Sequence, residues 1–266
     1  SQNGDLFGYS LAVGDFNGDG FDDLAIGVPK EDVLNNTRKD AGAVDIVYGS
    51  NDGLTLAYQN RWSLIQSNIS NGHSESGELF GSVLVAGDFD GDGFDDLAIG
   101  TPFDENKYGG NQGNIDVVYG SNWGITAWSG GATLTPEESI GDTGWGFVIE
   151  MAVGDFNNDG IEDLVVGSPG VHGYRGAVDF VFGNSARELM KGPRLIQAES
   201  SRLFGSQFGT NVVVGDFNGD GYVDMAATSF VGTYDDLFNF MSPDFVDIYF
   251  SDERGLNVRL DQRLEI

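Results

Sequence analysis

The sequence predicts an all-β protein made of four repeats with four strands each, and three observations lead to this prediction. The acidic stretch GDFNGDGFDD at residues 14–23 returns as GDFDGDGFDD, GDFNNDGIED and GDFNGDGYVD. The segments that accompany it return in the same order. They are short, rich in Val, Ile, Leu and aromatic residues, and bounded by Gly, Pro, Asn or Asp, as strands are. No window shows the periodicity of an amphipathic helix.

Each repeat holds its elements in a fixed order. An aromatic–Gly pair comes first, at residues 7–8, 80–81, 145–146 and 208–209. The acidic stretch begins at Gly14, Gly87, Gly154 and Gly215. A strand is predicted directly after it, at residues 23–29, 96–102, 163–169 and 224–230. The next strand is predicted at 42–50, 113–121, 176–184 and 245–251, and a less regular segment closes each repeat at 56–65, 126–134, 189–197 and 256–266.

Repeated four-stranded antiparallel sheets are typical of a β-propeller, whose blades surround a central axis. Small residues such as Ala12, Ala25 and Gly27 suit strands that are crowded near that axis. We therefore expect one propeller domain over residues 1–266, with blades near 5–66, 67–135, 136–198 and 199–266. Two questions stay open: whether four blades close into a ring or are a fragment or half of a larger one, and whether the fold is instead a β-sandwich.

Composition excludes several classes of function. The net charge of −29, from 42 acidic and 13 basic residues, argues against a nucleic-acid partner and an anionic membrane surface. The absence of cysteine excludes disulfides, thiolate metal sites and cysteine nucleophiles. Two histidines cannot build a histidine-rich zinc site. No apolar run is long enough for a transmembrane helix, so we expect no direct membrane insertion.

The acidic stretches have the residue types of a calcium loop. In residues 15–23, oxygen-bearing side chains stand at positions 1, 3, 5 and 9, glycine at position 6 permits a sharp turn, and position 7 offers its carbonyl. Ca²⁺ binds about six to eight oxygens, and it would relieve the repulsion between crowded carboxylates. The predicted ligands, for about four Ca²⁺ ions, are Asp15, Asn17, Asp19, Phe21, Asp23, Asp88, Asp90, Asp92, Phe94, Asp96, Asp155, Asn157, Asp159, Ile161, Asp163, Asp216, Asn218, Asp220, Tyr222 and Asp224.

Other interpretations of the stretch are weaker. An EF-hand needs a glutamate at position 12, where this chain has Ile26, Ile99, Val166 and Ala227. Mg²⁺ fits less well because it prefers strict octahedral geometry and retained waters. An acidic turn without metal is the remaining alternative.

The unit Phe-Gly, Gly-Asp-Phe-Asn-Gly-Asp-Gly, Asp-Leu-Ala-Ile-Gly-Val-Pro resembles the FG-GAP repeat of the integrin α-subunit propeller and its bacterial and fungal relatives. The resemblance implies that the acidic loops are calcium hairpins between the first two strands of each blade, on the lower face. It also implies that ligands bind the opposite, upper face. Integrin propellers have seven blades whereas four repeats are present here, and the fourth repeat has Ser229-Phe230 in place of the proline.

Two further sets of residues are candidates for binding. Aromatic and basic residues in the predicted upper-face loops could grip a peptide or stack on a sugar, or could pack against the rim; they are Tyr108, Tyr174, Arg175, Tyr234 and Phe238. An aspartate also stands in the third strand of every repeat, as Asp45, Asp116, Asp179 and Asp247. These aspartates either make hydrogen bonds between strands or blades, or form a ring of ligand-binding carboxylates.

The resulting expectation is a calcium-stabilised binding or adhesion module for a protein or carbohydrate ligand. We expect it to be extracellular, secreted or on the cell surface, and a periplasmic location is also compatible. We expect no enzymatic activity, because the sequence has no Ser/His/Asp order and no phosphate-binding loop. The alternatives are a propeller-scaffold polysaccharide lyase or hydrolase, and a structural or oligomerising part of a larger surface protein. Asn35 and Asn68 lie in glycosylation sequons whose use stays open.

Overall fold

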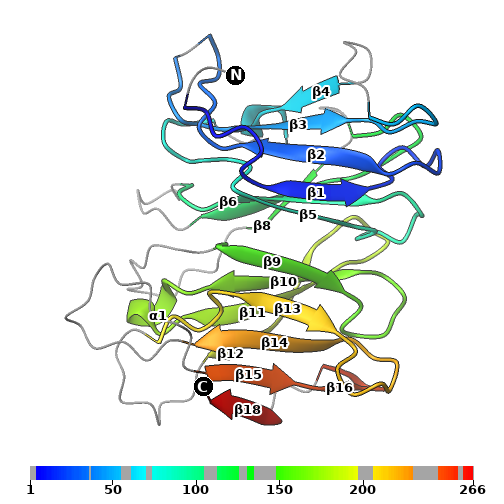
Figure 1. Cartoon of the computed structure of the whole chain (residues 1–266), viewed down its shortest axis with the longest axis vertical. Coiled ribbons are helices and arrows are strands. Elements are labelled where there is room, and N and C mark those ends of the chain that lie inside the picture. The colour runs from blue at the N-terminus through cyan, green and yellow to red at the C-terminus, as the bar shows by residue number, and fades with distance from the viewer. Residues whose placement is uncertain are drawn as a thin grey trace. The chain divides into compact units, whose positions relative to one another are not determined.

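The structure, a computed structural model of the chain, describes residues 4–35, 37–54, 61–69, 74–104, 113–125, 131–134, 148–196, 206–229, 245–256 and 260–265. These residues form four sheets of four strands each and one additional two-stranded hairpin (Figure 1). The only helical elements in the described ranges are η1 (Gln66–Asn68) and the single-turn helix α1 (Val171–Tyr174). The predicted all-β fold of four-stranded repeats is confirmed.

Each sheet follows the order of its strands in the chain, and all neighbours are antiparallel. The first sheet consists of β1 (Leu11–Gly14), β2 (Asp23–Val28), β3 (Ala43–Val47) and β4 (Arg61–Leu64). The second consists of β5 (Val83–Gly87), β6 (Asp96–Thr101), β7 (Asn114–Val118) and β8 (Gly131–Leu134). The third consists of β9 (Glu150–Gly154), β10 (Asp163–Ser168), β11 (Ala177–Phe182) and β12 (Met190–Ile196). The fourth consists of β13 (Val212–Gly215), β14 (Asp224–Ser229), β15 (Phe245–Tyr249) and β18 (Gln262–Glu265).

The first two strands of each sheet meet at the acidic stretch. Their register pairs the glycine before the stretch with its last aspartate, as Gly14–Asp23, Gly87–Asp96, Gly154–Asp163 and Gly215–Asp224. The residues between each pair therefore close a hairpin, as the sequence predicts. We call the segments 15–23, 88–96, 155–163 and 216–224 hairpins 1 to 4.

The closing strand of the fourth sheet begins later than predicted. The sequence pattern places it at residues 256–266, whereas β18 spans Gln262–Glu265. The preceding residues form a separate hairpin of β16 (Ser251–Asp252) and β17 (Gly255–Leu256). Gly255 has a φ of 94°, a conformation that glycine adopts without strain, so the chain folds back before the closing strand can start.

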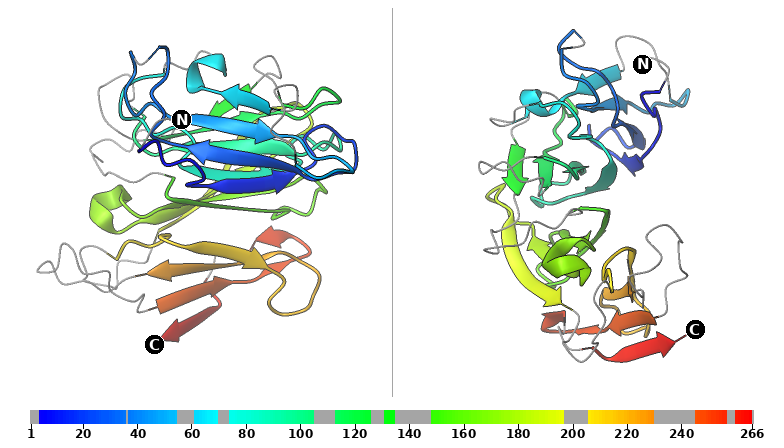
Figure 2. Two further views of the ribbon diagram at one scale, coloured as in Figure 1. Left: turned by 45° about the horizontal axis from the view of Figure 1, so that its top comes forward. Right: turned by 90° about the vertical axis from the view of Figure 1, so that its left-hand side faces the viewer.

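The contacts of the chain group it into two compact units. Unit 1 consists of residues 1–136 and 184–189, and unit 2 of residues 137–183 and 190–266. The first two sheets pack in unit 1 and the last two in unit 2, and Figure 2 shows their strands from two further directions. Each unit therefore buries its own core between two sheets.

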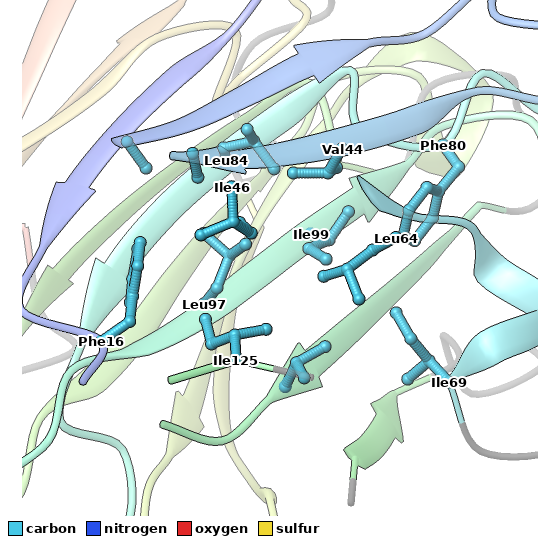
Figure 3. Packing of buried hydrophobic residues seen from close by; sticks show 13 residues of the cluster. Phe16, Val44, Ile46, Leu64, Ile69, Phe80, Leu84, Leu97, Ile99 and Ile125 are labelled. Atoms are coloured by element: carbon cyan, nitrogen blue, oxygen red, sulfur yellow. The ribbon is translucent and has the colours of Figure 1, made fainter. Parts of the chain in front are cut away.

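In unit 1 the buried side chains come from both sheets (Figure 3). Val44, Ile46 and Leu64 of the first sheet pack with Leu97 and Ile99 of the second, and all five are fully buried. In unit 2 the corresponding cluster includes Phe156, Phe180 and Phe208. The rings of Phe156 and Phe180 meet edge to face, with centroids 5.1 Å apart. Such cores explain why apolar residues recur at the same places in every repeat.

The aromatic–Gly pair has a different environment in the first repeat than in the second. Phe80 is fully buried and forms an isolated β-bridge with Gly42, just before β3, and in unit 2 Phe208 is fully buried and forms the same kind of bridge with Gly176, just before β11. Phe7, the equivalent residue of the first repeat, is 52% exposed. The aromatic residue is thus a core residue where another sheet of the same unit precedes it.

Candidate metal centre

The last aspartate of each hairpin is a buried clamp on two backbone amides. Asp23 Oδ2 accepts the N–H of Phe16 at 3.0 Å, and its Oδ1 accepts the N–H of Gly49 at 2.8 Å. The first bond closes the hairpin, and the second fastens it to the turn after β3. Because Asp23 is 1% exposed, both N–H groups would be left without an acceptor if this side chain were lost.

The other three hairpins repeat this clamp. Asp96 accepts from Phe89 and Gly120, Asp163 from Phe156 and Gly183, and Asp224 from Phe217 and Ser251, all at 2.8–3.0 Å. The sequence interpretation gave these aspartates a metal-binding role alone and missed the clamp. The glycines at 49, 120 and 183, just after the third strands, are the sequence feature from which the clamp could have been predicted. In hairpin 1 a Cβ added at Gly49 would stand 2.3 Å from the carbonyl oxygen of Asp22.

The remaining oxygen-bearing side chains wrap the tip of each hairpin. In hairpin 1, Asp15 accepts the N–H groups of Asp19 and Gly20 at 3.1 and 2.9 Å, and Asp19 accepts that of Phe21 at 3.0 Å. Asn17 Oδ1 accepts the Asp19 N–H at 2.9 Å. The glycine at position 6 has a positive φ of 86–92° in all four hairpins, which a side chain would strain.

Hairpins 2, 3 and 4 hold the same pattern of bonds from positions 1, 3 and 5 to the backbone. The structure therefore describes the full set of predicted ligand residues and brings each repeat's side chains together in one hairpin. Position 7, held by Phe21, Phe94, Ile161 and Tyr222, lies just beyond the turn in each case. That these residues bind Ca²⁺ stays a prediction.

The geometry of hairpin 2 fits a hard cation. Carboxylate oxygens of Asp88, Asp90 and Asp96 all lie within 4.8 Å of one another. Two oxygens on one Ca²⁺ can be up to about 5 Å apart, because each Ca²⁺–oxygen distance is about 2.3–2.6 Å. Ca²⁺ prefers oxygen ligands, and every predicted ligand of this hairpin is an oxygen atom. The residues present therefore fit this ion.

Burial and like charge raise the pKa values of Asp23, Asp96 and Asp163. Desolvation raises the pKa of Asp23 to about 6, of Asp163 to about 7 and of Asp96 to about 8. The neighbouring carboxylates of the same hairpin raise these pKa values further, and the backbone N–H bonds lower them. A divalent cation at the hairpin would favour the ionised form and lower each pKa.

The described upper-face candidates lie in the connection between β10 and β11. Tyr174 ends helix α1 and is 45% exposed, and Arg175 follows it at the surface. The backbone there is fastened to the start of the fourth repeat: Gln207 N–H donates to the Tyr174 carbonyl at 2.9 Å and Phe208 N–H to the Arg175 carbonyl at 3.0 Å. Tyr108, Tyr234 and Phe238 lie outside the described residues. A ligand site at these residues stays a prediction.

Asp45, Asp179 and Asp247 of the third strands make cross-strand contacts with the fourth strand, whereas Asp116 accepts a hydrogen bond from Asn114 Nδ2 of its own strand at 3.3 Å. Asp179 and Asp247 each form a two-bond ion pair with the arginine opposite, Arg194 or Arg263, at 2.5–3.0 Å. Asp45 accepts the hydroxyl of Ser63, its partner in register, at 2.7 Å. These bonds favour the structural interpretation of the aspartates over a ring of ligand-binding carboxylates.

Comparison with known proteins gives concordant matches. The FG-GAP repeat model matches residues 7–47, 80–118 and 147–181. Integrin alpha-PS2 of Drosophila melanogaster is 32% identical over 261 residues, covering 91% of this chain and 16% of that protein. Phosphatidylinositol-glycan-specific phospholipase D of Mus musculus is 33% identical over 168 residues, covering 63% of this chain and 19% of that protein. The chain thus spans less than a fifth of either relative.

A solved structure has a similar fold. Rhamnogalacturonan lyase PL11 of Bacillus licheniformis superimposes with a TM-score of 0.52 at 16% identity, covering 92% of this chain and 41% of that one. At this identity the likeness concerns the fold alone. Among the described residues, no helix has the length and apolar character needed to cross a membrane.

Proposed function

Because this chain is an FG-GAP repeat β-propeller similar to integrin alpha subunits, we propose that it is a calcium-stabilised binding module that works outside the cell or at its surface. The observation that carries the proposal is the convergence of Asp88, Asp90 and Asp96 within 4.8 Å. The equivalent side chains of hairpins 1, 3 and 4 close around the same kind of turn.

The hairpin side chains would hold the ion, and the clamp aspartates would link the hairpin to its sheet. When bound, Ca²⁺ supplies positive charge that offsets the repulsion among the carboxylates. Positions 1, 3 and 5 orient their oxygens through bonds to the hairpin backbone, as Asp15 and Asp19 do. The clamp aspartate joins this loop to the turn after the third strand. Ion binding in the loop would therefore stabilise the whole blade.

We propose a protein as the ligand, contacted at the end of the sheets away from the hairpins. Tyr174 and Arg175 present an aromatic ring and a positive charge there, next to each other at the surface. Tyrosine and arginine are enriched at the centres of protein interfaces. The similarity to integrin alpha subunits, rather than the lyase-like fold, favours a protein over a polysaccharide.

The calcium part is tested by thermal unfolding and metal analysis. We expect chelation to lower the melting temperature well beyond the effect of matched ionic strength, and dialysis to leave about four Ca²⁺ per chain. A chain that retains no Ca²⁺ and melts at the same temperature with and without chelator would overturn this part.

The ligand part is tested by binding to protein and glycan arrays, followed by a turnover assay on every hit. We expect saturable protein binding that Arg175→Ala weakens and that Arg254→Ala, a surface change at the β16–β17 turn, does not. A glycan that is bound and cleaved would instead establish the enzymatic alternative. Sedimentation of the pure chain as a stable oligomer would favour the structural one.

A further inference from the structure

Hairpin 2 differs from the other three at position 3. It has Asp90 there, whereas the others have Asn17, Asn157 and Asn218. In hairpins 3 and 4 this asparagine donates its Nδ2–H to Oδ2 of the aspartate at position 5, at 3.1 Å to Asp159 and 3.0 Å to Asp220. An ionised aspartate has no proton to donate. In hairpin 2 a hydrogen bond that links the side chains of positions 3 and 5 must therefore come from a donor elsewhere in the chain.

Arg187 is that donor. Its Nε donates to Asp90 Oδ2 at 2.6 Å, and its NH2 group donates to Asp92 Oδ2 at 2.8 Å. The guanidinium thus joins position 3 to position 5, as the asparagine amide does in hairpins 3 and 4. It covers Asp90, whose side chain is 3% exposed. Charge-assisted bonds of this length are among the stronger hydrogen bonds in proteins.

The conformation and packing of the segment around Arg187 stabilise this contact. Residues 184–189 connect β11 to β12 in the chain and pack within unit 1, the unit that contains hairpin 2. Arg187 has a φ of 60°, which residues other than glycine rarely adopt. The carboxamide oxygen of Asn184 holds this turn by accepting the N–H of Ala186 at 2.9 Å. The guanidinium also lies 5.0 Å from the centroid of the Tyr119 ring, a cation–π contact.

The number of carboxylates in each hairpin indicates that Arg187 and a divalent cation would compete for the same negative charge. The four side-chain positions of hairpin 2 carry four carboxylates, and those of each other hairpin carry three and an amide. Arg187 offsets the additional negative charge and already occupies oxygens of Asp90 and Asp92. A cation at the same carboxylates would stand close to the guanidinium, and like charges at short range repel.

We propose that Arg187 competes with the divalent cation for Asp90 and Asp92, and that this competition gives hairpin 2 a lower calcium affinity than the other hairpins. The inference rests on the proposed calcium function. Arg187 holds hairpin 2 together when Ca²⁺ is scarce, and it leaves the carboxylates when Ca²⁺ binds. Segment 184–189 is then docked at low Ca²⁺ and released at high Ca²⁺.

Hydrogen–deuterium exchange on the full chain, across a Ca²⁺ titration at constant ionic strength, tests this locally. We expect Ca²⁺ to slow exchange in hairpins 1, 3 and 4 first, and in hairpin 2 at about tenfold higher concentration. Exchange in 184–189 should become faster over that same higher range. The variant Arg187→Gln should shift the response of hairpin 2 to about tenfold lower Ca²⁺.

Two further variants test whether the effect on hairpin 2 is specific to Arg187. Arg194→Gln removes an arginine that pairs with Asp179 outside the hairpins, and it should leave the midpoint of hairpin 2 unchanged. The double variant Asp90→Asn with Arg187→Gln gives hairpin 2 the residue pattern of hairpin 1, and its midpoint should match that of hairpin 1.

The outcomes separate the two proposals. If hairpins 1, 3 and 4 respond to Ca²⁺ while Arg187→Gln leaves the response of hairpin 2 unchanged or weakens it, the competition is wrong. Slower exchange of 184–189 in Ca²⁺ would overturn it in the same way. If no hairpin responds in any variant, the calcium function itself fails.

Discussion

Asp23 and Gly49 lie 26 residues apart in the chain, and the Asp23 carboxylate accepts the Gly49 N–H at 2.8 Å. The same carboxylate accepts the Phe16 N–H at 3.0 Å. One buried side chain thus joins the acidic hairpin to the turn that follows the third strand. This side chain therefore fastens the hairpin to the rest of its sheet.

Replacing the clamp should destabilise the chain without any metal. We expect Asp23→Asn to lower the free energy of unfolding by about 1–3 kcal/mol at pH 8 with chelator, because an amide cannot accept both N–H bonds. Urea unfolding measures this change. Asp22→Asn, at an exposed neighbour, is the control and should have little effect. Equal stability of the two variants would show that the clamp contributes nothing.

The raised pKa values predict how stability without Ca²⁺ depends on pH. Asp23, Asp163 and Asp96 have folded pKa values of about 6, 7 and 8, above their usual value of 3.8. Between pH 4 and these values the folded chain binds more protons than the unfolded chain, so stability falls as pH rises. We expect the chelated protein to melt at a higher temperature at pH 5 than at pH 8.

Calcium should reverse this dependence, because ionised carboxylates bind the ion better than protonated ones. Calorimetric titration at pH 6.5 in two buffers of different ionisation enthalpy should show proton release on Ca²⁺ binding. Proton uptake, or a melting temperature without Ca²⁺ that rises from pH 5 to pH 8, would contradict the assignment of these pKa shifts.

The aromatic–Gly pairs provide a matched test of packing. Phe80 is fully buried, and Phe7 is 52% exposed. We expect Phe80→Ala to cost about 3–5 kcal/mol of unfolding free energy. Phe7→Ala should cost well under 1 kcal/mol, as exposed surface substitutions usually do. Denaturant unfolding of the two variants gives the comparison, and similar losses would show that the aromatic residue is not a core residue in the second repeat.

The ion pair of Asp247 and Arg263 should couple the last two strands of the fourth sheet. Asp247 is 1% exposed and the side chain of Arg263 is 33% exposed, so the pair is partly desolvated. A double-mutant cycle with Asp247→Asn and Arg263→Met should give a coupling of about 1–2 kcal/mol, reduced from a fully buried pair by solvent screening. If the effects of the two substitutions on the unfolding free energy are simply additive, the ion pair does not stabilise the fold.

The strands and hairpins were predictable because their signals are local. The alternation of Leu24 and Ile26 with small residues, and the glycines of the hairpin, act within a few residues of each other. The four sheets and the gathering of the acidic side chains in each hairpin were therefore found from the chain alone. The late start of β18 was missed, because Leu256 fits the start of a strand equally well until the turn at Gly255 places it in β17.

The four repeats, their strand order and the position of each acidic hairpin could be read from the residues alone, since these follow from residue spacing within one repeat. The contacts of the polar side chains could be known only from the folded chain. The clamp on Gly49, the arginine partners of Asp179 and Asp247, and the contact of Arg187 with Asp90 across 97 residues of chain all needed it. Such pairs form because folding brings distant residues to one place, and the desolvation of a buried charge then selects the partner that can satisfy it.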